Sequence, residues 1–292
     1  MSHFCAPGQA LAVCAPVAWQ DETMTFIWDI RARVQFEGDA HVLEDSCGFN
    51  GPNAWIIDGA TSLLDPLNLP AASDPQWLAQ QLSMILAQVS SDPSVSSDPR
   101  SATTSRHGVR ALLADSLAAI DSAGTVLVGP EMVRFPSAAI SVAQLTSRGV
   151  EIASLADCSV VVRTQDGATH LVRAELADAR IPEGTPEQRL AKLRQDRELR
   201  NTPDRLWVAR REPEAADHAH VVQLSRPEIM VMASDGAWRA VDLGLVSGPE
   251  EFLARTSTTV DALGLMHELR VHQGRIGEVA DDATVLTLAP HP

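Results

Sequence analysis

The order of apolar patterns along the chain is the feature that most restricts its fold. Strand-like segments, alternating or continuously apolar, surround two separate pairs of segments with the three- and four-residue spacing of amphipathic helices. The helical segments are residues 74–90, 107–123, 248–257 and 260–273, and the strand segments are residues 25–36, 53–58, 137–146, 149–157, 159–164, 168–174, 218–235 and 283–290. Two packed antiparallel sheets, each covered by helices, satisfy this order. We therefore predict an α+β fold, a four-layer α/β/β/α sandwich.

One domain accounts for most of the 292 residues, and we place it at residues 24–292. Residues 1–23 form a disordered leader in this interpretation, because Met24 and the strand-like TFIWDI could mark the functional start. Residues 175–205, here called the charged segment, are rich in charge and only weakly periodic. This pattern predicts an exposed helical or irregular excursion outside the core.

The formal net charge of -15 limits the partners of the protein. A field of this sign repels nucleic acid and anionic membrane surfaces, so neither is expected as a partner. The four cysteines show neither C-x-x-C spacing nor histidine pairing, and reduced thiols in a cytoplasm are the simpler explanation. No stretch approaches the roughly 20 apolar residues that a bilayer requires. A cytoplasmic location is therefore expected.

Acidic residues beside small residues stand at the ends of several strand-like segments. The five places are Glu44-Asp45-Ser46, Asp58-Gly59, Ala156-Asp157-Cys158, Ser234-Asp235-Gly236 and Asp281-Asp282-Ala283. A single aspartate at such a position is usually a turn former or a helix cap. Several carboxylates at one edge of a sheet repel one another unless cations neutralise them, and oxygen-only ligands favour Mg²⁺ or Mn²⁺. Two such ions can lower the pKa of a shared water and hold the oxygens of a phosphate group.

The segments GDAHVLEDS, AWIIDGATSL, EIASLADCSVVV, IMVMASDGAW and DDATVLTL form an ordered series across residues 25–290. In order and rough spacing this series resembles the motifs of the metal-dependent type 2C protein serine/threonine phosphatases (PPM family), as a divergent bacterial branch. The resemblance implies that a metal-activated water hydrolyses phosphoserine and phosphothreonine in proteins. It also implies two Mn²⁺ or Mg²⁺ ions, a third ion in bacterial members, a phosphoprotein substrate and a Ser/Thr kinase system as partner. The charged segment would be a flap beside the active site.

The resemblance assigns most of the acidic residues to two metal ions. Asp58 would bridge the ions, and the Gly59 carbonyl and Glu44 would complete the second metal site, Glu44 partly through water. Asp235 and Asp281 would hold the first ion. Glycine at position 59 suits this role, because backbone must come close to an ion there.

Two other acidic residues have different roles in the resemblance. Asp157 would help to hold the third, weaker ion. Asp45 would orient the attacking water, so Asp45 and Asp58 are the expected catalytic residues.

The chain departs from the family at several motif positions. Ala40 stands where the family commonly has an arginine that binds the substrate phosphate. Ala60 stands where eukaryotic members have a histidine proposed as general acid, although many bacterial members lack it. Ala156 replaces the glycine before Asp157, and Asp282 stands where many members have asparagine. Phosphate binding must then use another group or rely on the metal.

A few basic residues are candidates for contacts at the site. His41, next to the missing arginine, could contact the phosphate, although a solvated loop histidine is the more common role. Arg31 and Arg33 on the first strand are weaker candidates, because a strand arginine is more often simply exposed. His218 and His220 resemble a metal pair, but a strand with outward-facing side chains explains them better.

A second class of function is also compatible with the sequence. The missing arginine and the altered neighbourhood of Asp58-Gly59 would suit a phosphatase-like binding module that recognises phosphoproteins or regulates a kinase with little turnover. A phosphatase that acts on small molecules is a third hypothesis. The carboxylate at every expected metal-ligand position favours an active protein phosphatase over both, because we expect degenerate members to lose these ligands first.

Overall fold

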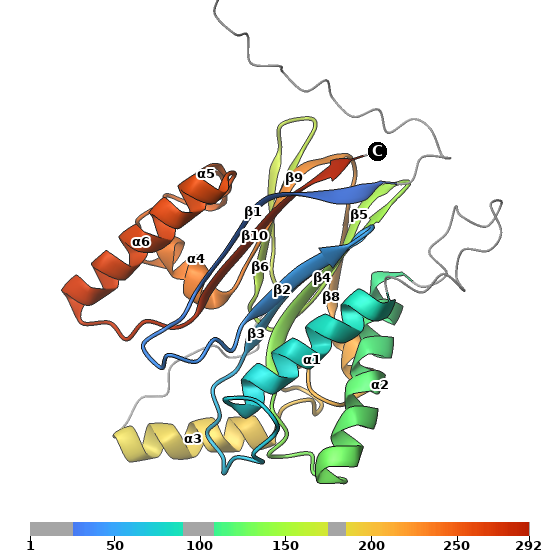
Figure 1. Ribbon diagram of the computed structural model, residues 1–292, viewed down its shortest axis with the longest axis vertical. Coiled ribbons are helices and arrows are strands. Elements are labelled where there is room, and N and C mark those ends of the chain that lie inside the picture. Colours follow the sequence, from blue (N-terminus) through green and yellow to red (C-terminus); the bar gives the residue numbers. More distant parts are fainter. Residues whose placement is uncertain (1–25, 90–107, 175–184, 292) are drawn as a thin grey trace, which may run out of the picture.

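The computed structural model describes residues 26–89, 108–174 and 185–291. The predicted leader at residues 1–23 and the first part of the charged segment, residues 175–184, lie outside the described residues. The described residues form two packed sheets with helices on both outer faces (Figure 1). The predicted four-layer α/β/β/α sandwich is therefore confirmed.

Two five-stranded sheets form the centre of the molecule, and their paired strands are antiparallel. The first sheet contains, in order, β1 (Ile27–Phe36), β10 (Ala283–His291), β9 (Pro227–Ala233), β6 (Ser159–Thr164) and β7 (Thr169–Val172). The second sheet contains β2 (Ser46–Asn50), β3 (Asn53–Gly59), β4 (Ala138–Thr146), β5 (Gly149–Leu155) and β8 (His220–Leu224). Each sheet thus combines strands from distant parts of the sequence.

Helices cover the two outer faces of the sandwich. On the second sheet lie α1 (Asp74–Val89) and α2 (Val109–Val128). On the first sheet lie α4 (Asp235–Asp242), α5 (Pro249–Arg255) and α6 (Thr259–Ile276). The charged segment contributes α3 (Pro186–Glu198), which lies across one end of the sandwich in Figure 1.

The sequence of β3 is continuously apolar because both of its faces are covered. Trp55 and Ile57 belong to the buried cluster beneath α1 and α2, whereas Ala54 and Ile56 belong to the cluster between the two sheets. A third cluster, which includes Phe252, joins the first sheet to α4, α5 and α6. A strand in this position cannot alternate between polar and apolar residues, because neither face meets water.

The structure differs from the sequence-based expectation in a few elements. Strand β2 and helix α4 were not expected, because SCGFN and DGAWRAVD are too short and too polar to show a clear period. His218 was expected in a strand, which is wrong. It ends a 3₁₀-helix (Pro213–His218), where its ring stacks on Trp207 with centroids 3.5 Å apart, and only His220 lies in β8.

Helix α2 is long and apolar enough to cross a membrane by length and composition alone. In the structure, Leu113, Leu117 and Ile120 are fully buried in the cluster between this helix and the second sheet. The apolar character of α2 is thus explained by packing, because a core helix must bury one apolar face.

The buried face of α2 allows a matched test of the packing. We expect Leu117→Ala to lower the free energy of unfolding by about 2–5 kcal/mol, because it leaves a cavity in a closed core. Leu127→Ala on the same helix removes the same atoms from a side chain that is 48% exposed, and we expect a much smaller effect. Urea titration of both variants measures the difference, and equal destabilisation would contradict the assigned face.

Candidate functional site

The acidic residues that the sequence singles out gather at one end of the sandwich. Ser159 and Val285 are both paired with Ala233, so the neighbouring ends of β6, β9 and β10 lie level with one another. Asp157, Asp235 and Asp281 stand just beyond these ends, while Asp58 lies near the end of β3 and Glu44 and Asp45 precede β2. Strand register therefore brings carboxylates from across the chain to one place.

Asp58 and Asp235 make a direct contact between the two sheets at this end. The backbone N–H of Asp235, at the first turn of α4, donates to Asp58 Oδ2 at 3.2 Å. Burial raises the pKa of Asp58 well above its usual value, and the charges of Asp45, Asp235 and Asp157 raise it further. Burial, with Asp157 and Asp281 nearby, raises the pKa of Asp235 to about 6. These carboxylates therefore interact with one another across the sheets.

Asp45 is the most deeply buried carboxylate of the site. It is 5% exposed, and its Oδ2 atom has no hydrogen-bond partner. Burial raises its pKa to about 8, and hydrogen bonds from the side chains of Thr284 and Ser234 oppose this rise only in part. A buried oxygen without a donor is costly, which marks Oδ2 as a position for a further partner.

Asp282 has a structural role that the sequence did not reveal. Its Oδ1 accepts from the backbone N–H of Gly38 at 2.7 Å, and its Oδ2 accepts from that of Glu44 at 2.5 Å. One carboxylate thereby fixes both ends of the loop that leads to Asp45. The Glu44 side chain accepts from the Ser73 hydroxyl at 2.5 Å, and burial raises its pKa.

Gly59 and Gly236 allow close backbone approaches within the site. A Cβ at position 59 would lie 2.6 Å from the carbonyl oxygen of Glu44. A Cβ at position 236 would lie 1.9 Å from the carbonyl oxygen of Asp282. The glycines in the two Asp-Gly pairs are therefore required by packing, whether or not an ion is bound.

The segment that carries Asp157 is held in a strained turn. Ala156 has a left-handed backbone with φ of 61°, a conformation that glycine adopts without cost and other residues adopt at roughly 1–2 kcal/mol. The Asp157 carbonyl accepts from Arg173 Nε at 3.1 Å, and the Arg173 guanidinium lies over the Trp238 ring at 5.7 Å. The alanine that departs from the family motif thus occupies a glycine conformation.

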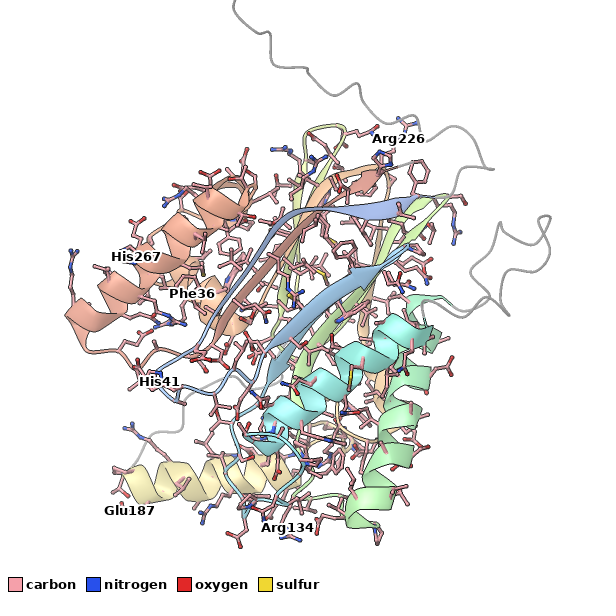
Figure 2. All side chains as sticks on the ribbon, viewed as in Figure 1. Phe36, His41, Arg134, Glu187, Arg226 and His267 are labelled. Carbon is pink, nitrogen blue, oxygen red and sulfur yellow. The ribbon has the colours of Figure 1, made fainter. Side chains whose placement is uncertain are left out.

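Of the other candidates, Asp281 and His41 lie near the acidic end, whereas Arg31 and Arg33 lie further along β1. Asp281 is exposed, and Arg270 of α6 donates to its backbone carbonyl. His41 is exposed in the loop after β1 (Figure 2). Its backbone N–H donates to the Gly38 carbonyl at 3.1 Å. Arg31 lies 3.7 Å from Asp29, and Arg33 donates to Gln35 at 3.1 Å, so both bind neighbours on β1.

The donor set suits hard divalent cations, although the side chains are not arranged around one. Among the described residues, no group of three His, Cys, Asp or Glu side chains has the geometry of a bound metal ion. The unpartnered Oδ2 of Asp45 and the repulsion that raises the pKa of Asp58 both fit a cation between the carboxylates. The carboxylate oxygens favour Mg²⁺ or Mn²⁺ over zinc and copper, which prefer thiolate and imidazole ligands.

Several residues beside the acidic end escaped the sequence analysis. They are Ser73, Arg173 and Thr284, which contact the acidic residues, and Arg197 and Arg200, which come from the end of the charged segment. Ser234 and Asp282 were named in the motifs, but their supporting roles were not expected. Thr284 adjoins a recognised motif, so its hydroxyl could have been considered. No pattern in the sequence marks the two arginines.

Comparisons with known proteins identify the fold. No protein-family model and no curated protein matches the sequence. Among solved structures, the chain is similar to the serine/threonine phosphatase PstP/Ppp of Mycobacterium tuberculosis, with 13% identity, 91% of this chain and 99% of that chain covered, and a TM-score of 0.56. The catalytic domain of PstP in complex with two manganese ions gives 17% identity, 92% and 100% coverage and a TM-score of 0.52.

A third similar structure is the PPM Ser-Thr phosphatase MsPP of Mycobacterium smegmatis in complex with cacodylate. Its identity is 13%, the coverage is 88% of this chain and 97% of that chain, and the TM-score is 0.50. These similarities span nearly the whole chain. The fold is that of bacterial PPM-type serine/threonine phosphatases, which confirms the fold expected from the motif series.

The close approach at Gly236 generates a testable prediction. We expect Gly236→Ala to lower the melting temperature by several degrees, because the new Cβ must displace the Asp282 carbonyl and the turn before β10. Gly264→Ala in α6 is the matched control, since no atom lies within 4 Å of its added Cβ and alanine favours a helix. A Gly236→Ala variant as stable as the control would contradict this packing.

The raised pKa values predict how stability depends on pH. The folded chain holds protons on Asp45 and Asp235 that the unfolded chain, with aspartate pKa near 3.9, has released. Folding therefore takes up protons between about pH 4 and pH 8, and the metal-free protein loses stability as the pH rises across this range. Urea titration in EDTA at pH 5 and pH 8 measures the loss.

Asp45→Asn provides the control for this effect, because asparagine is uncharged at every pH. We expect this variant to lose less free energy of unfolding than the wild type between pH 5 and pH 8. We also expect Mn²⁺ to raise the stability of the wild type more at pH 8 than at pH 5. Parallel pH profiles of the two proteins would overturn the assignment.

Proposed function

We propose that the chain hydrolyses phosphoserine and phosphothreonine in proteins at a centre of two Mn²⁺ or Mg²⁺ ions. The convergence of Asp45, Asp58 and Asp235 at the shared end of two sheets, in a fold found in serine/threonine phosphatases, carries this proposal. The substrate would be a phosphoprotein, and the protein would work with a Ser/Thr kinase system. The acidic chain would need cations to accept such an anionic substrate.

The ligands of the proposed ions come from both sheets. Asp58 would bridge the ions, Asp235 and Asp281 would hold the first, and Glu44 and the Gly59 carbonyl would complete the second. When bound, such ions polarise phosphoryl oxygens and lower the pKa of a water molecule. The repulsion that raises the pKa of Asp58 supports this assignment, because a cation would relieve it.

Asp157 would help to hold a third, weaker ion in this proposal. Its backbone is tied to Arg173, whose guanidinium lies over the ring of Trp238 on α4, the helix that begins at Asp235. This contact links Asp157, the proposed ligand of the third ion, to α4, the helix that carries Asp235, a proposed ligand of the first ion.

Asp45 would orient the water that attacks the phosphorus atom. Its Oδ2 lacks a partner, while the side chains of Ser234 and Thr284 hydrogen-bond to the carboxylate. The carboxylate can therefore accept a hydrogen bond from a water molecule while it keeps the hydrogen bonds from Ser234 and Thr284. Asp282 holds the backbone of the preceding loop, which limits the movement of Asp45.

Hydrolysis assays test the proposal. We expect the purified protein to hydrolyse p-nitrophenyl phosphate and a phosphothreonine peptide only with Mn²⁺ or Mg²⁺ present. Asp58→Asn and Asp235→Asn should each lower kcat by at least about a hundredfold, because the loss of a ligand weakens both metal binding and charge stabilisation. Asp217→Asn, an exposed aspartate on the 3₁₀-helix, is the matched control and should keep wild-type activity.

An intact, metal-loaded protein that leaves both substrates unhydrolysed would overturn the proposed activity. If that protein still bound the phosphothreonine peptide in isothermal titration, the binding module that lacks turnover would be the better description. Circular dichroism of each variant would exclude loss of the fold as the cause of lost activity.

A further inference from the structure

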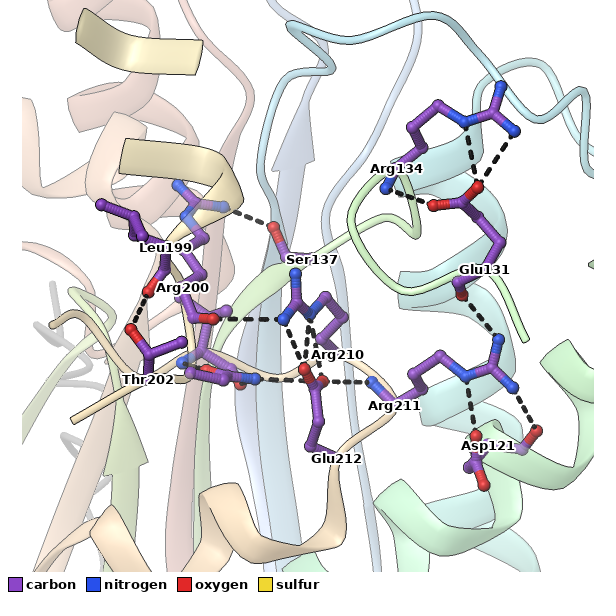
Figure 3. A network of polar contacts seen from close by, with 12 residues as sticks. Asp121, Glu131, Arg134, Ser137, Leu199, Arg200, Thr202, Arg210, Arg211 and Glu212 are labelled. Atoms are coloured by element: carbon purple, nitrogen blue, oxygen red, sulfur yellow. Dashed lines mark hydrogen bonds and ion pairs between the residues drawn. The ribbon is translucent and has the colours of Figure 1, made fainter. Parts of the chain in front are cut away.

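Three arginines from the end of the charged segment and the chain beyond it meet beside the acidic end. Arg197 lies near the end of α3, Arg200 follows the helix, and Arg210 precedes the 3₁₀-helix. Arg197 Nη1 donates to the Ser137 hydroxyl at 3.1 Å. Arg200 Nη1 donates to the same oxygen, as Figure 3 shows. Arg210 Nη2 donates to the Arg200 carbonyl at 3.1 Å. Two cationic groups thus converge on one neutral hydroxyl.

The positive charge of this cluster is only partly neutralised. Glu212 accepts from Arg210 Nε at 2.9 Å and also accepts from the Asn201 side chain, so its carboxylate is occupied. Within the part of the chain that the structure describes, no carboxylate lies within 4.0 Å of the Arg197 or Arg200 guanidinium. Among the described residues, both guanidinium groups therefore have neutral hydrogen-bond partners, and an anion beside them would supply the missing counter-charge.

Burial makes this excess charge costly. Arg197 is 8% exposed, and its Nε atom has no hydrogen-bond partner, as is also true of Arg210 Nη1. Burial lowers the pKa of Arg197 to about 10, and burial together with the charges of Arg197 and Arg210 lowers that of Arg200 to about 9. A bound anion would neutralise the repulsion between these groups.

The cluster adjoins the candidate metal ligands. Arg197 donates to the Ala60 carbonyl at 3.2 Å and to the Thr61 carbonyl, immediately after Asp58 and Gly59. Glu44 acts electrostatically on Arg197, and Asp157 acts on Arg200. The arginines therefore lie close enough to Glu44 and Asp157 to interact with them electrostatically. A phosphate group bound at the acidic end would be attracted by the same positive charges.

The attachment of α3 depends on these polar contacts. The helix starts with a Thr185–Gln188 capping box, and Arg197 is its only buried residue. Without a buried apolar face, the helix is held at the end of the sandwich mainly by side-chain hydrogen bonds, including Arg194 Nε to the Leu63 carbonyl at 3.0 Å. The arginines are thus presented by an element that contributes little to the core.

We propose that Arg200, held in place beside Arg197, binds the phosphate monoester group of the substrate, in place of the arginine that is absent at position 40. This inference rests on the proposed phosphatase function. The planar guanidinium groups match the oxygens of a phosphate dianion, and Arg200, which is partly exposed, is the group that meets the substrate first. The Ser137 hydroxyl fixes the spacing of the two side chains.

Substitutions of Arg200 test this site by its affinity for phosphate. In steady-state hydrolysis of p-nitrophenyl phosphate, we expect Arg200→Gln to raise KM and the inhibition constant of inorganic phosphate by about tenfold or more, as expected for a lost charge-assisted hydrogen bond. We expect kcat to fall by a smaller factor. Arg200→Lys should recover part of the affinity, because it keeps the charge but loses the planar fork.

Lys192→Gln is the matched control, since it removes one positive charge from an exposed side chain of α3 that pairs with Asp196 on the same helix. It should change KM and the inhibition constant less than about twofold, because exposed charges are screened by salt. Unchanged KM and inhibition constants in a folded Arg200→Gln variant would overturn the proposal. If that variant does not fold, the same comparison is made with Arg200→Lys and Arg197→Lys, where unchanged values for both would overturn it.

Direct binding separates this inference from the proposed activity. Isothermal titration of the protein with inorganic phosphate, in buffer without substrate, should show binding that Arg200→Gln weakens and Lys192→Gln does not. If hydrolysis is absent while this pattern holds, the proposed function fails and the anion site stands. If hydrolysis is present but phosphate affinity is the same in all three proteins, the function stands and the anion site fails.

Discussion

Repulsion among carboxylates held at one end of two sheets is the interaction on which the rest of this structure depends. Burial raises the pKa of Asp45 to about 8. Burial and the charges of neighbouring acids raise the pKa of Asp58 well above its usual value. Such a cluster destabilises the fold unless protons or cations neutralise it. The sandwich can carry this cost because three buried apolar clusters join its four layers. The packing of the core thus offsets the destabilisation caused by the carboxylates at this end.

The same end shows how the backbone supports the acidic residues. Asp282 fixes the loop before Asp45 through two amides, and Gly59 and Gly236 let the backbone segments of Glu44 and Asp282 approach too closely for any side chain. Asp235 reaches Asp58 through its backbone N–H as well as its charge. Aspartates of this end therefore have different structural roles, because different groups surround each of them. Asp282 holds a loop, whereas Asp235 and Asp58 interact across the two sheets.

The fold could be predicted from the sequence because its signals are local. The apolar run of β3 and its Asp58-Gly59 end follow from burial and turn chemistry, and the ordered motifs specify how distant strands combine. The role of Asp282 could not be predicted, since a clamp and a metal ligand are the same residue type in the same motif. Arg197 was missed because α3 is polar on all sides, so its sequence does not indicate which side chain turns inward, and Arg200 follows this helix in an equally charged stretch. His218 was misplaced because stacking on Trp207 outweighs the alternating pattern around it.

Helix α3 has a consequence for how such a protein can diversify. Its outward residues pack against nothing in the described core, so most of them can change without loss of stability, while the inward arginines hold the helix in place. Changes in these outward residues can therefore reshape the outer surface of the helix without altering the strand ends beneath it. Paralogues of this chain would be expected to diverge fastest along this helix and to retain the strand ends.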